Sequence, residues 1–274
     1  MNRNERLIGL ISYFLMNPRK HQTLNFFSEK FHAGKTSISE DLDILNELFK
    51  KEKVGFLERV KGRAGGVKFI PKLTLEQSEQ FIGELCEQLH DSSRVLPGGY
   101  LYMSDLLGRP EFVQEVGELL AAVFESREID AVMTVETKGI PLAYAVAASL
   151  KVPVIIVRRD PKVTEGPSVS INYVSGSSRK IQTMVLPKRS LQEGMNVCII
   201  DDFMKAGGTI NGMVNLLEEF DAKAVAIGVL AEADDEEEER VIHDYVSLIK
   251  ISGIDMHHKK IDVQPGNVFQ YLKK

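Results

Sequence analysis

Two adjacent carboxylates precede a glycine pair and a hydroxyl in the stretch VCIIDDFMKAGGTI, residues 197–210. The run from Val197 to Ile200 is apolar and largely β-branched, which predicts a strand buried on both faces of a parallel sheet. After this strand, Asp201 and Asp202 could accept hydrogen bonds from a ribose diol or hold a hydrated Mg²⁺. The chain must then turn into a helix, because apolar residues recur at helical spacing from Met213 to Phe220.

The glycines of this stretch let backbone amides come close to a ligand. Gly207 and Gly208 carry no Cβ, so the main chain can approach a bound group and its amides can form a nest at the start of the helix. Such a nest favours an anion, most often phosphate. The alternative is an ordinary turn with solvated aspartates. The predicted phosphate, sugar and metal site consists of Asp201, Asp202, Phe203, Met204, Lys205, Ala206, Gly207, Gly208 and Thr209.

A second strand, loop and helix precede this one in the chain. Residues 131–135 form an apolar run, and Pro141 begins a helical pattern. Between them, Thr137, Lys138 and Gly139 supply amides and a cation. Alternating strands and helices from residue 129 onward predict a parallel sheet with helices on its faces, so the two loops should lie at the same edge. Residues 154–157 form a further apolar run that predicts a buried strand, and residues 171–173 could lie in a hairpin.

At these residues the sequence resembles the type I phosphoribosyltransferases, in which two acidic residues and a loop ending in Gly-x-Thr hold phosphoribosyl pyrophosphate (PRPP). Thr137, Lys138 and Gly139 resemble the pyrophosphate loop of the adenine and xanthine enzymes. The resemblance implies that Mg²⁺ binds with PRPP near Asp201 and Asp202. Further residues that could reach the ligand, or could instead be packing or solvated residues, are Tyr100, Tyr102, Arg158, Arg159, Arg179 and Lys180.

Charge is divided unevenly along the 274 residues. Residues 1–72 contain 14 lysines and arginines against 8 acidic residues, whereas the remainder contains 20 against 31. A basic first quarter on an acidic body suggests that the first quarter contacts a polyanion. The sequence contains no apolar run long enough to span a bilayer, and we expect a cytoplasmic protein.

The first quarter has the pattern of three helices followed by a hairpin. Apolar stripes mark helices ending near Asn17, near Phe31 and near Phe49, and Gly34 is available for a left-handed turn before the third. Ser37 with Glu40 has the pattern of a capping box that opens the third helix. Strands are expected at 54–60 and 67–70, around a loop with three glycines and two cations.

This arrangement predicts a winged helix-turn-helix. Its third helix would place its N-terminal end in the major groove of DNA, and its wing would reach phosphates. The alternative is a three-helix domain that binds protein and whose cations are only solvated; the charge asymmetry favours DNA. The predicted DNA contacts are Lys35, Thr36, Ser37, Ser39, Arg59, Lys61 and Arg63.

Two residues of the ligand loop depart from the transferase pattern. Lys205 stands where hypoxanthine-type enzymes have an acidic general base, and a cation cannot accept that proton at neutral pH. Ala206 stands at the usual hydroxyl position, which removes a hydrogen bond worth about 0.5–1.5 kcal/mol. Lys205 could offset part of this loss by its charge. Adenine-type enzymes have alanine at the Lys205 position, so catalysis is weakened rather than excluded.

Together, the basic winged helix and the altered transferase-like domain resemble the purine operon repressors of Gram-positive bacteria. The fold expected is therefore α/β, with a winged-helix DNA-binding domain at 1–72 and a phosphoribosyltransferase-like domain for effector binding and dimerisation at 73–274. The resemblance implies a homodimeric repressor of purine biosynthesis genes without transferase activity, induced by PRPP, with guanosine tetraphosphate as a competing ligand. The rivals are an active purine phosphoribosyltransferase with an accessory domain and an adaptor that binds protein.

Overall fold

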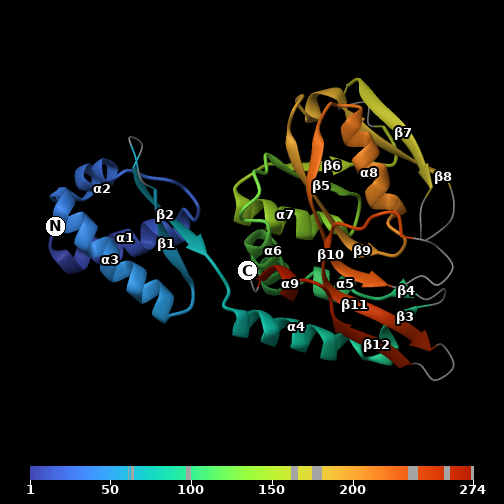
Figure 1. Cartoon of the computed structure of the whole chain (residues 1–274), viewed down its shortest axis with the longest axis horizontal. Coiled ribbons are helices and arrows are strands. Elements are labelled where there is room, and N and C mark those ends of the chain that lie inside the picture. Colours follow the sequence, from blue (N-terminus) through green and yellow to red (C-terminus); the bar gives the residue numbers. More distant parts are fainter. Residues whose placement is uncertain are drawn as a thin grey trace. The chain divides into compact units, whose positions relative to one another are not determined.

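A computed structural model of the chain describes all residues except 61, 63–64, 97–99, 162–165, 175–180, 234–239, 256–259 and 273–274. The chain divides into two compact units, Met1–Thr74 and Leu75–Lys274 (Figure 1). Each unit is described by itself. No helix among the described residues is long and apolar enough to cross a membrane.

The smaller unit contains three helices and a two-stranded hairpin (Figure 1). Its strands are antiparallel, and an isolated bridge between Gln22 and Val67 adds a short third segment to the hairpin. The loop at 61–65, where the wing was predicted, lies mostly outside the described residues. The elements are α1 (Arg3–Met16), α2 (Leu24–Phe31), α3 (Lys35–Lys51), β1 (Gly55–Val60) and β2 (Gly66–Pro71).

Local sequence explains where these helices begin, with two corrections to the predictions. α1 begins with a capping box in which the Asn2 side chain accepts from the Glu5 amide and Glu5 accepts from the Asn2 amide. The predicted capping box at Ser37 is wrong, because α3 begins two residues earlier, after Gly34. Gly34 is also not the left-handed residue; its φ is −63°, and His32 takes the left-handed conformation that ends α2.

The core of the smaller unit joins all three helices to the hairpin. Apolar side chains from every element form one buried cluster, which includes Phe14, Phe27 and Phe49. Beside it, the fully buried carboxylate of Asp41 accepts hydrogen bonds from Nε of Arg3 (3.1 Å) and of Arg6 (2.5 Å). These ion pairs tie α1 to α3, the helix predicted to enter DNA.

The larger unit is built on a six-stranded sheet (Figure 1). The strand order is β12-β11-β10-β9-β5-β6, and every neighbouring pair is parallel except β11 with β12. The elements are α4 (Leu75–Leu89), η1 (Ser92–Arg94), β3 (Val95–Leu96), β4 (Tyr100–Leu101), α5 (Ser104–Leu107), α6 (Pro110–Val123), β5 (Ala131–Val135), α7 (Gly139–Leu150), β6 (Val154–Val157), β7 (Ser168–Val174), β8 (Ile181–Pro187), η3 (Lys188–Ser190), β9 (Asn196–Met204), α8 (Gly208–Glu218), β10 (Lys223–Ala233), β11 (Val246–Asp255), β12 (Lys260–Pro265) and α9 (Phe269–Leu272).

Two layers cover the sheet. On one face, α8 and the β7–β8 hairpin share a buried cluster with β5, β9 and β10. On the other face lie α6 and α7, which pack against each other so closely that a Cβ on Gly117 would stand 2.6 Å from Ala145 (Figure 1). Strands covered on both faces need apolar residues throughout, and all five residues of β5 are buried.

The sheet differs from the prediction at both edges. β6 was expected to be a buried strand, but it is the edge strand and only its alternate residues are fully buried. At the opposite edge, β12 runs antiparallel and was not predicted. The predicted hairpin around residues 171–173 does form, but these residues lie inside β7, which pairs with β8 along its length.

Candidate functional site

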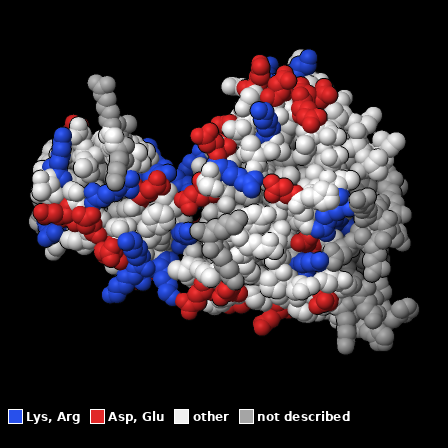
Figure 2. All heavy atoms as spheres, viewed as in Figure 1, with Lys and Arg blue, Asp and Glu red and all other residues white. Residues whose placement is uncertain are grey.

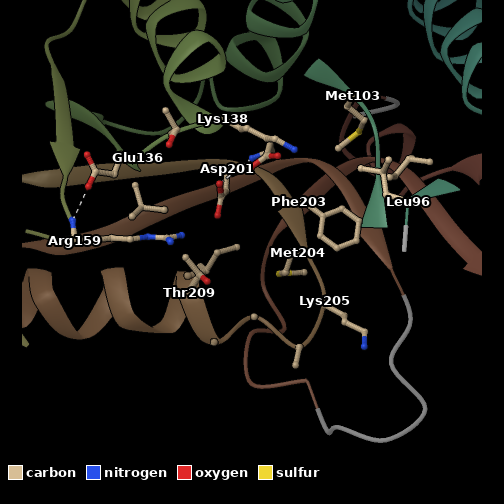
Figure 3. A pocket seen from close by; sticks show the side chains of 18 residues that line it. Leu96, Met103, Glu136, Lys138, Arg159, Asp201, Phe203, Met204, Lys205 and Thr209 are labelled. Atoms are coloured by element: carbon tan, nitrogen blue, oxygen red, sulfur yellow. Dashed lines mark hydrogen bonds between the residues drawn. The ribbon is translucent and has the colours of Figure 1, made fainter. Parts of the chain in front are cut away.

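The two predicted loops meet at one edge of the sheet. β5 and β9 are parallel neighbours, with Ala131 opposite Val197, so both strands deliver their carboxyl ends to the same place. A cavity of about 640 Å³ opens there (Figure 3). Its lining residues are Leu96, Leu101, Met103, Val135, Glu136, Thr137, Lys138, Arg159, Asp201, Asp202, Phe203, Met204, Lys205, Ala206, Gly207, Gly208, Thr209 and Ile210.

The loop between β9 and α8 places the N-terminus of a helix beside the cavity. Gly207 has a φ of 87°, a left-handed conformation that favours glycine, and it is the N-terminal cap of α8. Its carbonyl oxygen accepts from the Asn211 amide at 2.8 Å, which starts the helical hydrogen-bond pattern. The first amides of an eleven-residue helix therefore lie beside the cavity, where they attract negative charge.

Two carboxylates stand at the end of β9. Asp201 is 5% exposed, and its Oδ1 accepts from the Asp202 amide at 2.9 Å. Burial, reinforced by the nearby charge of Asp202, raises the pKa of Asp201 well above its usual value. Burial also raises the pKa of Asp202, although Asp201 and Lys138 counteract part of the shift. A ligand that brings hydroxyl donors or a cation would favour the ionised form of both.

The loop after β5 brings cations to the same cavity. Lys138 precedes α7, and Figure 3 shows its side chain reaching toward the aspartates. Glu136 accepts a hydrogen bond from the Arg159 amide at 2.8 Å and forms an ion pair with Arg158 at 3.6 Å. These contacts fix the end of β6, and the Arg159 guanidinium extends toward Asp201 and Thr209 (Figure 3).

The β7–β8 hairpin supports the anion loop from behind. The Tyr173 hydroxyl donates to Oε1 of Gln182 at 2.8 Å and is also hydrogen-bonded to Thr209. Burial raises the pKa of Tyr173 despite the nearby charge of Arg159 and the bond to Thr209. The ring leaves no room for a side chain at Gly212, where a Cβ would stand 2.9 Å from it. This hairpin thus fixes the start of α8.

The cavity includes most residues that the sequence singled out. Of the twelve residues predicted to bind PRPP, Gly139 alone does not line the cavity; it packs behind the wall, against Thr134 and Asp201. Arg159 lines the cavity, whereas Arg158 does not. Arg179, Lys180 and the side chain of Tyr100 lie outside the described residues. Lys205 also lines the cavity, and in Figure 3 its side chain extends away from Asp201 and Thr209.

Sequence reasoning missed the apolar wall of the cavity. Leu101 and Met103 line it, but Tyr102 between them is 44% exposed and does not. Consecutive residues of an extended segment point in opposite directions, so Tyr102 faces away from the cavity that its neighbours line. The alternation of aromatic and aliphatic residues at 100–103 was the signal available. The other lining residues missed are Leu96, Val135, Glu136 and Ile210.

The predicted DNA contacts lie around the start of α3. Lys35 and Thr36 are exposed there, and Ser37 and Ser39 are partly exposed. Arg59 on β1 donates to Oγ of Ser39 at 3.1 Å and forms an ion pair with Asp43 at 2.5 Å. Lys61 and Arg63 lie outside the described residues. On the face drawn in Figure 2, basic and acidic side chains are mixed over this unit.

Comparison with known proteins gives matches for both units. The family described as bacterial purine repressor, N-terminal, matches residues 2–71, and the phosphoribosyl transferase domain matches residues 103–265. The purine biosynthesis transcriptional repressor of Bacillus subtilis (strain 168) is 54% identical over 99% of this chain and 95% of its own. The protein named purine biosynthesis transcriptional activator of Lactococcus lactis subsp. lactis (strain IL1403) is 45% identical over 98% of this chain and 99% of its own.

Among solved structures, an adenine phosphoribosyltransferase from Thermoanaerobacter pseudethanolicus matches with a TM-score of 0.51 and 24% identity. The match covers 60% of this chain and 99% of the adenine phosphoribosyltransferase chain. This likeness shows the fold of the larger unit. The full-length matches and both domain matches confirm the predicted fold class and family. The chain belongs to the family of bacterial purine biosynthesis transcriptional regulators, which join a purine-repressor N-terminal domain to a phosphoribosyltransferase domain.

Proposed function

We propose that this protein represses purine biosynthesis genes by binding their DNA, and that PRPP in the cavity relieves this binding. The observation that carries the proposal is the composition of the cavity. The N-terminus of α8, the carboxylates of Asp201 and Asp202 and the cations of Lys138 and Arg159 all line it. The same chain also has a purine-repressor domain. A cavity of about 640 Å³ is in the range of small-molecule sites.

The charges of the cavity suit the three parts of PRPP. Amides at Gly207, Gly208 and Thr209 would hold the 5′-phosphate. Asp201 and Asp202 would accept hydrogen bonds from the ribose diol. Lys138 and Arg159 would neutralise the pyrophosphate, which Arg159 can bind through two parallel N–H donors.

A divalent cation fits the same arrangement. Mg²⁺ prefers oxygen ligands and commonly binds through a carboxylate together with substrate phosphates. Asp201 and Asp202 would stand beside it, and the cation would lower the energy of their ionised forms in a buried site. We therefore expect PRPP to bind more tightly when Mg²⁺ is present. Guanosine tetraphosphate is expected to compete for the cavity because it also carries a diphosphate.

DNA binding is assigned to residues 1–72. Lys35, Thr36, Ser37 and Ser39 would face the major groove, and Arg59, Lys61 and Arg63 would contact DNA near the wing. Residues 73–274 would bind the effector and form a homodimer, since helix-turn-helix regulators commonly bind DNA as symmetric dimers. A regulator of chromosomal genes acts in the cytoplasm. The Bacillus subtilis relative, 54% identical, is named a repressor, and the Lactococcus lactis relative, 45% identical, is named an activator; the higher identity supports repression.

We propose that the protein does not catalyse phosphoribosyl transfer. Of the described cavity residues, the acidic ones are Glu136, Asp201 and Asp202. Glu136 is held by Arg158 and by the Arg159 amide, and the aspartates are assigned to ribose and metal. Lys205 stands where hypoxanthine-type enzymes have an acidic general base, whereas adenine-type enzymes have alanine there. The transferase fold nevertheless keeps the ligand site, so an active purine phosphoribosyltransferase remains the rival function, with an adaptor that binds protein as a third possibility.

The test is binding of the full chain to a labelled duplex from a purine-gene promoter at physiological salt, with and without millimolar PRPP and Mg²⁺. We expect tight binding that PRPP releases, and weaker binding to a shuffled duplex of equal length. Equal binding to both duplexes would contradict the proposal. Formation of a nucleotide from PRPP and adenine, guanine, hypoxanthine or xanthine would establish the rival enzyme.

A further inference from the structure

A buried polar cluster lies at the end of β10, outside the cavity. Its centre is Glu232, which is 5% exposed. The Tyr245 hydroxyl and an Nη of Arg240 each lie 2.5 Å from Oε2 of Glu232, and the Ser247 hydroxyl donates to Oε1 at 2.5 Å. The other Nη of Arg240 donates to the Ala233 carbonyl oxygen at 3.1 Å. The Glu232 carboxylate, the Tyr245 hydroxyl and the Ala233 carbonyl oxygen therefore all bond the Arg240 guanidinium.

Stability alone does not explain such a cluster. Replacing a buried ion pair with apolar residues is often neutral or stabilising, because removing two charges from water is expensive. Glu232 is surrounded by apolar strands, and β10 and β11 are otherwise rich in valine, leucine and isoleucine. The cluster instead fixes one geometry: its ion pair and hydroxyl bonds hold the segment after residue 239 against the end of β10.

The segment held by Arg240 supports the phosphate loop. The Val241 amide donates to the Ala206 carbonyl oxygen at 3.0 Å. Ile242 packs against Gly207, where an added Cβ would stand 3.1 Å from the Ile242 Cγ1. The Val241 side chain is 53% exposed, so its contribution to this contact comes from the backbone.

The bond to Ala206 also sets the direction of an amide. A trans peptide is planar, and its C=O and N–H point to opposite sides. When the Ala206 carbonyl is turned toward Val241, the Gly207 N–H is turned away from Val241. Ala206 and Gly207 both line the cavity, so this orientation of the peptide decides which backbone groups a phosphate meets.

We propose that Glu232 and Arg240 are positioning residues for the phosphate-binding loop, and that they set the affinity for the phosphate end of the ligand without contacting it. This inference rests on the proposed function, since it concerns the 5′-phosphate of PRPP. The Ala206 position lacks a hydroxyl that could grip the phosphate, so the loop depends on its backbone amides. Backbone amides bind well only when they are already oriented.

The test uses the full chain with Glu232→Gln and Arg240→Met, and titration calorimetry with PRPP and Mg²⁺. We expect the Kd for PRPP to rise about tenfold in each variant, which corresponds to about 1.4 kcal/mol. Ribose 5-phosphate should lose affinity by a similar factor. Inorganic pyrophosphate, which would bind at Lys138 and Arg159, should keep its affinity. Arg240→Lys, which retains the cation, should recover part of the loss.

Val241→Ala is the matched control, because it changes an exposed side chain beside Arg240 and keeps the amide that donates to Ala206. Its Kd should equal that of the wild type. Unchanged PRPP affinity in both Glu232→Gln and Arg240→Met would overturn the inference, and so would an equal loss for pyrophosphate, which would indicate general damage to the unit. If the wild type itself fails to bind PRPP, the proposed function falls and this inference falls with it.

Discussion

Gly139 at the start of α7 lies against the buried carboxylate of Asp201 at the end of β9. A Cβ on Gly139 would stand 3.1 Å from Oδ1 of Asp201 and 2.3 Å from Oγ1 of Thr134. The two loops thus pack against each other. Gly139, which was predicted to bind pyrophosphate, instead leaves space for Asp201, which was predicted to bind ribose. The positions of the two loops are therefore coupled through packing.

Asp201→Asn should stabilise the ligand-free protein at high pH and abolish tight PRPP binding. Burial raises the pKa of Asp201, so the folded state binds its proton more strongly than the unfolded chain. The free energy of unfolding therefore falls as pH rises from the ordinary value of 3.8 through the raised pKa. Asparagine does not titrate and keeps Oδ1 for the Asp202 amide. A gain of about 1 kcal/mol would raise the unfolding midpoint by about 2–4 °C.

Calorimetric scans at pH 5 and pH 8 check this prediction. The midpoint of the variant should exceed that of the wild type more at pH 8 than at pH 5. Asp160→Asn, at an exposed position, serves as the control and should change neither the midpoint nor the affinity for PRPP. An equal destabilisation by Asp201→Asn at both pH values would contradict the explanation.

Gly207→Ala should abolish PRPP binding, a larger loss of affinity than its destabilisation of the fold would cause. The position has a φ of 87°, where alanine is strained by about 1–2 kcal/mol, and the new Cβ would press on Ile242 at 3.1 Å. Gly194→Ala is the matched control: its φ is 80°, and nothing lies within 4 Å of its Cβ position. Both variants should lose stability, but PRPP affinity should fall only for Gly207→Ala, as measured by calorimetry.

Lys35→Gln should weaken binding to every duplex, specific or not. A lysine at the start of α3 that neutralises one phosphate contributes to counterion release, so its loss reduces the slope of log K against log salt by about 1. Lys50→Gln changes the same charge at the opposite end of α3, where Lys50 pairs with Glu47 at 3.0 Å. Titrations at several salt concentrations should show the smaller slope for Lys35→Gln alone.

Asp41→Ala should strongly lower the free energy of unfolding of the smaller unit, because it leaves the largely buried Arg6 without its carboxylate partner. Breaking a buried pair in this way costs about 3–5 kcal/mol. Asp43→Ala, two residues along the same helix, removes a solvent-exposed pair with Arg59 and should cost about 0–1 kcal/mol. Urea unfolding followed by circular dichroism separates the two results. Equal losses would mean that the Asp41 ion pairs are not what joins α1 to α3.

PRPP can release DNA only if it prefers the conformation that binds DNA less well. A tenfold effect requires about 1.4 kcal/mol of coupling between the two sites. If part of this coupling is direct repulsion between bound PRPP and DNA, the salt slope of DNA binding should differ with and without PRPP. Identical slopes, with a changed affinity, would leave conformational change as the whole explanation.

Sequence patterns were reliable where periodicity decided the structure. The predicted strands at 131–135 and 154–157 match β5 and β6 to the residue, because apolar runs bounded by turns leave few alternatives. The fold class followed from the order of such elements. The meeting of Lys138 with Asp201 and Asp202 was also predictable, since adjacent parallel strands bring their ends together.

Features set by distant contacts were not predictable. β12 pairs antiparallel with β11, but its short sequence, KIDVQP, carries no sign of direction. The capping prediction at Ser37 was wrong because the turn after His32 lets α3 begin at Lys35. The choice between Tyr102 and Met103 depends on which face of a short extended segment is turned toward the cavity. The Glu232 cluster joins residues from separate elements whose spacing has no periodic pattern.

The position of α4 decides where a fragment that contains only the larger unit can begin. The match to the phosphoribosyl transferase domain begins at residue 103, but the compact unit begins at Leu75. α4 packs on β11 and β12, and its Phe81 ring lies 5.7 Å from that of Phe112 on α6. Truncation at the domain match would remove this helix from the last strands of the sheet, where Ile261 and Val263 of β12 are buried. A fragment that begins at Leu75 retains the closed core.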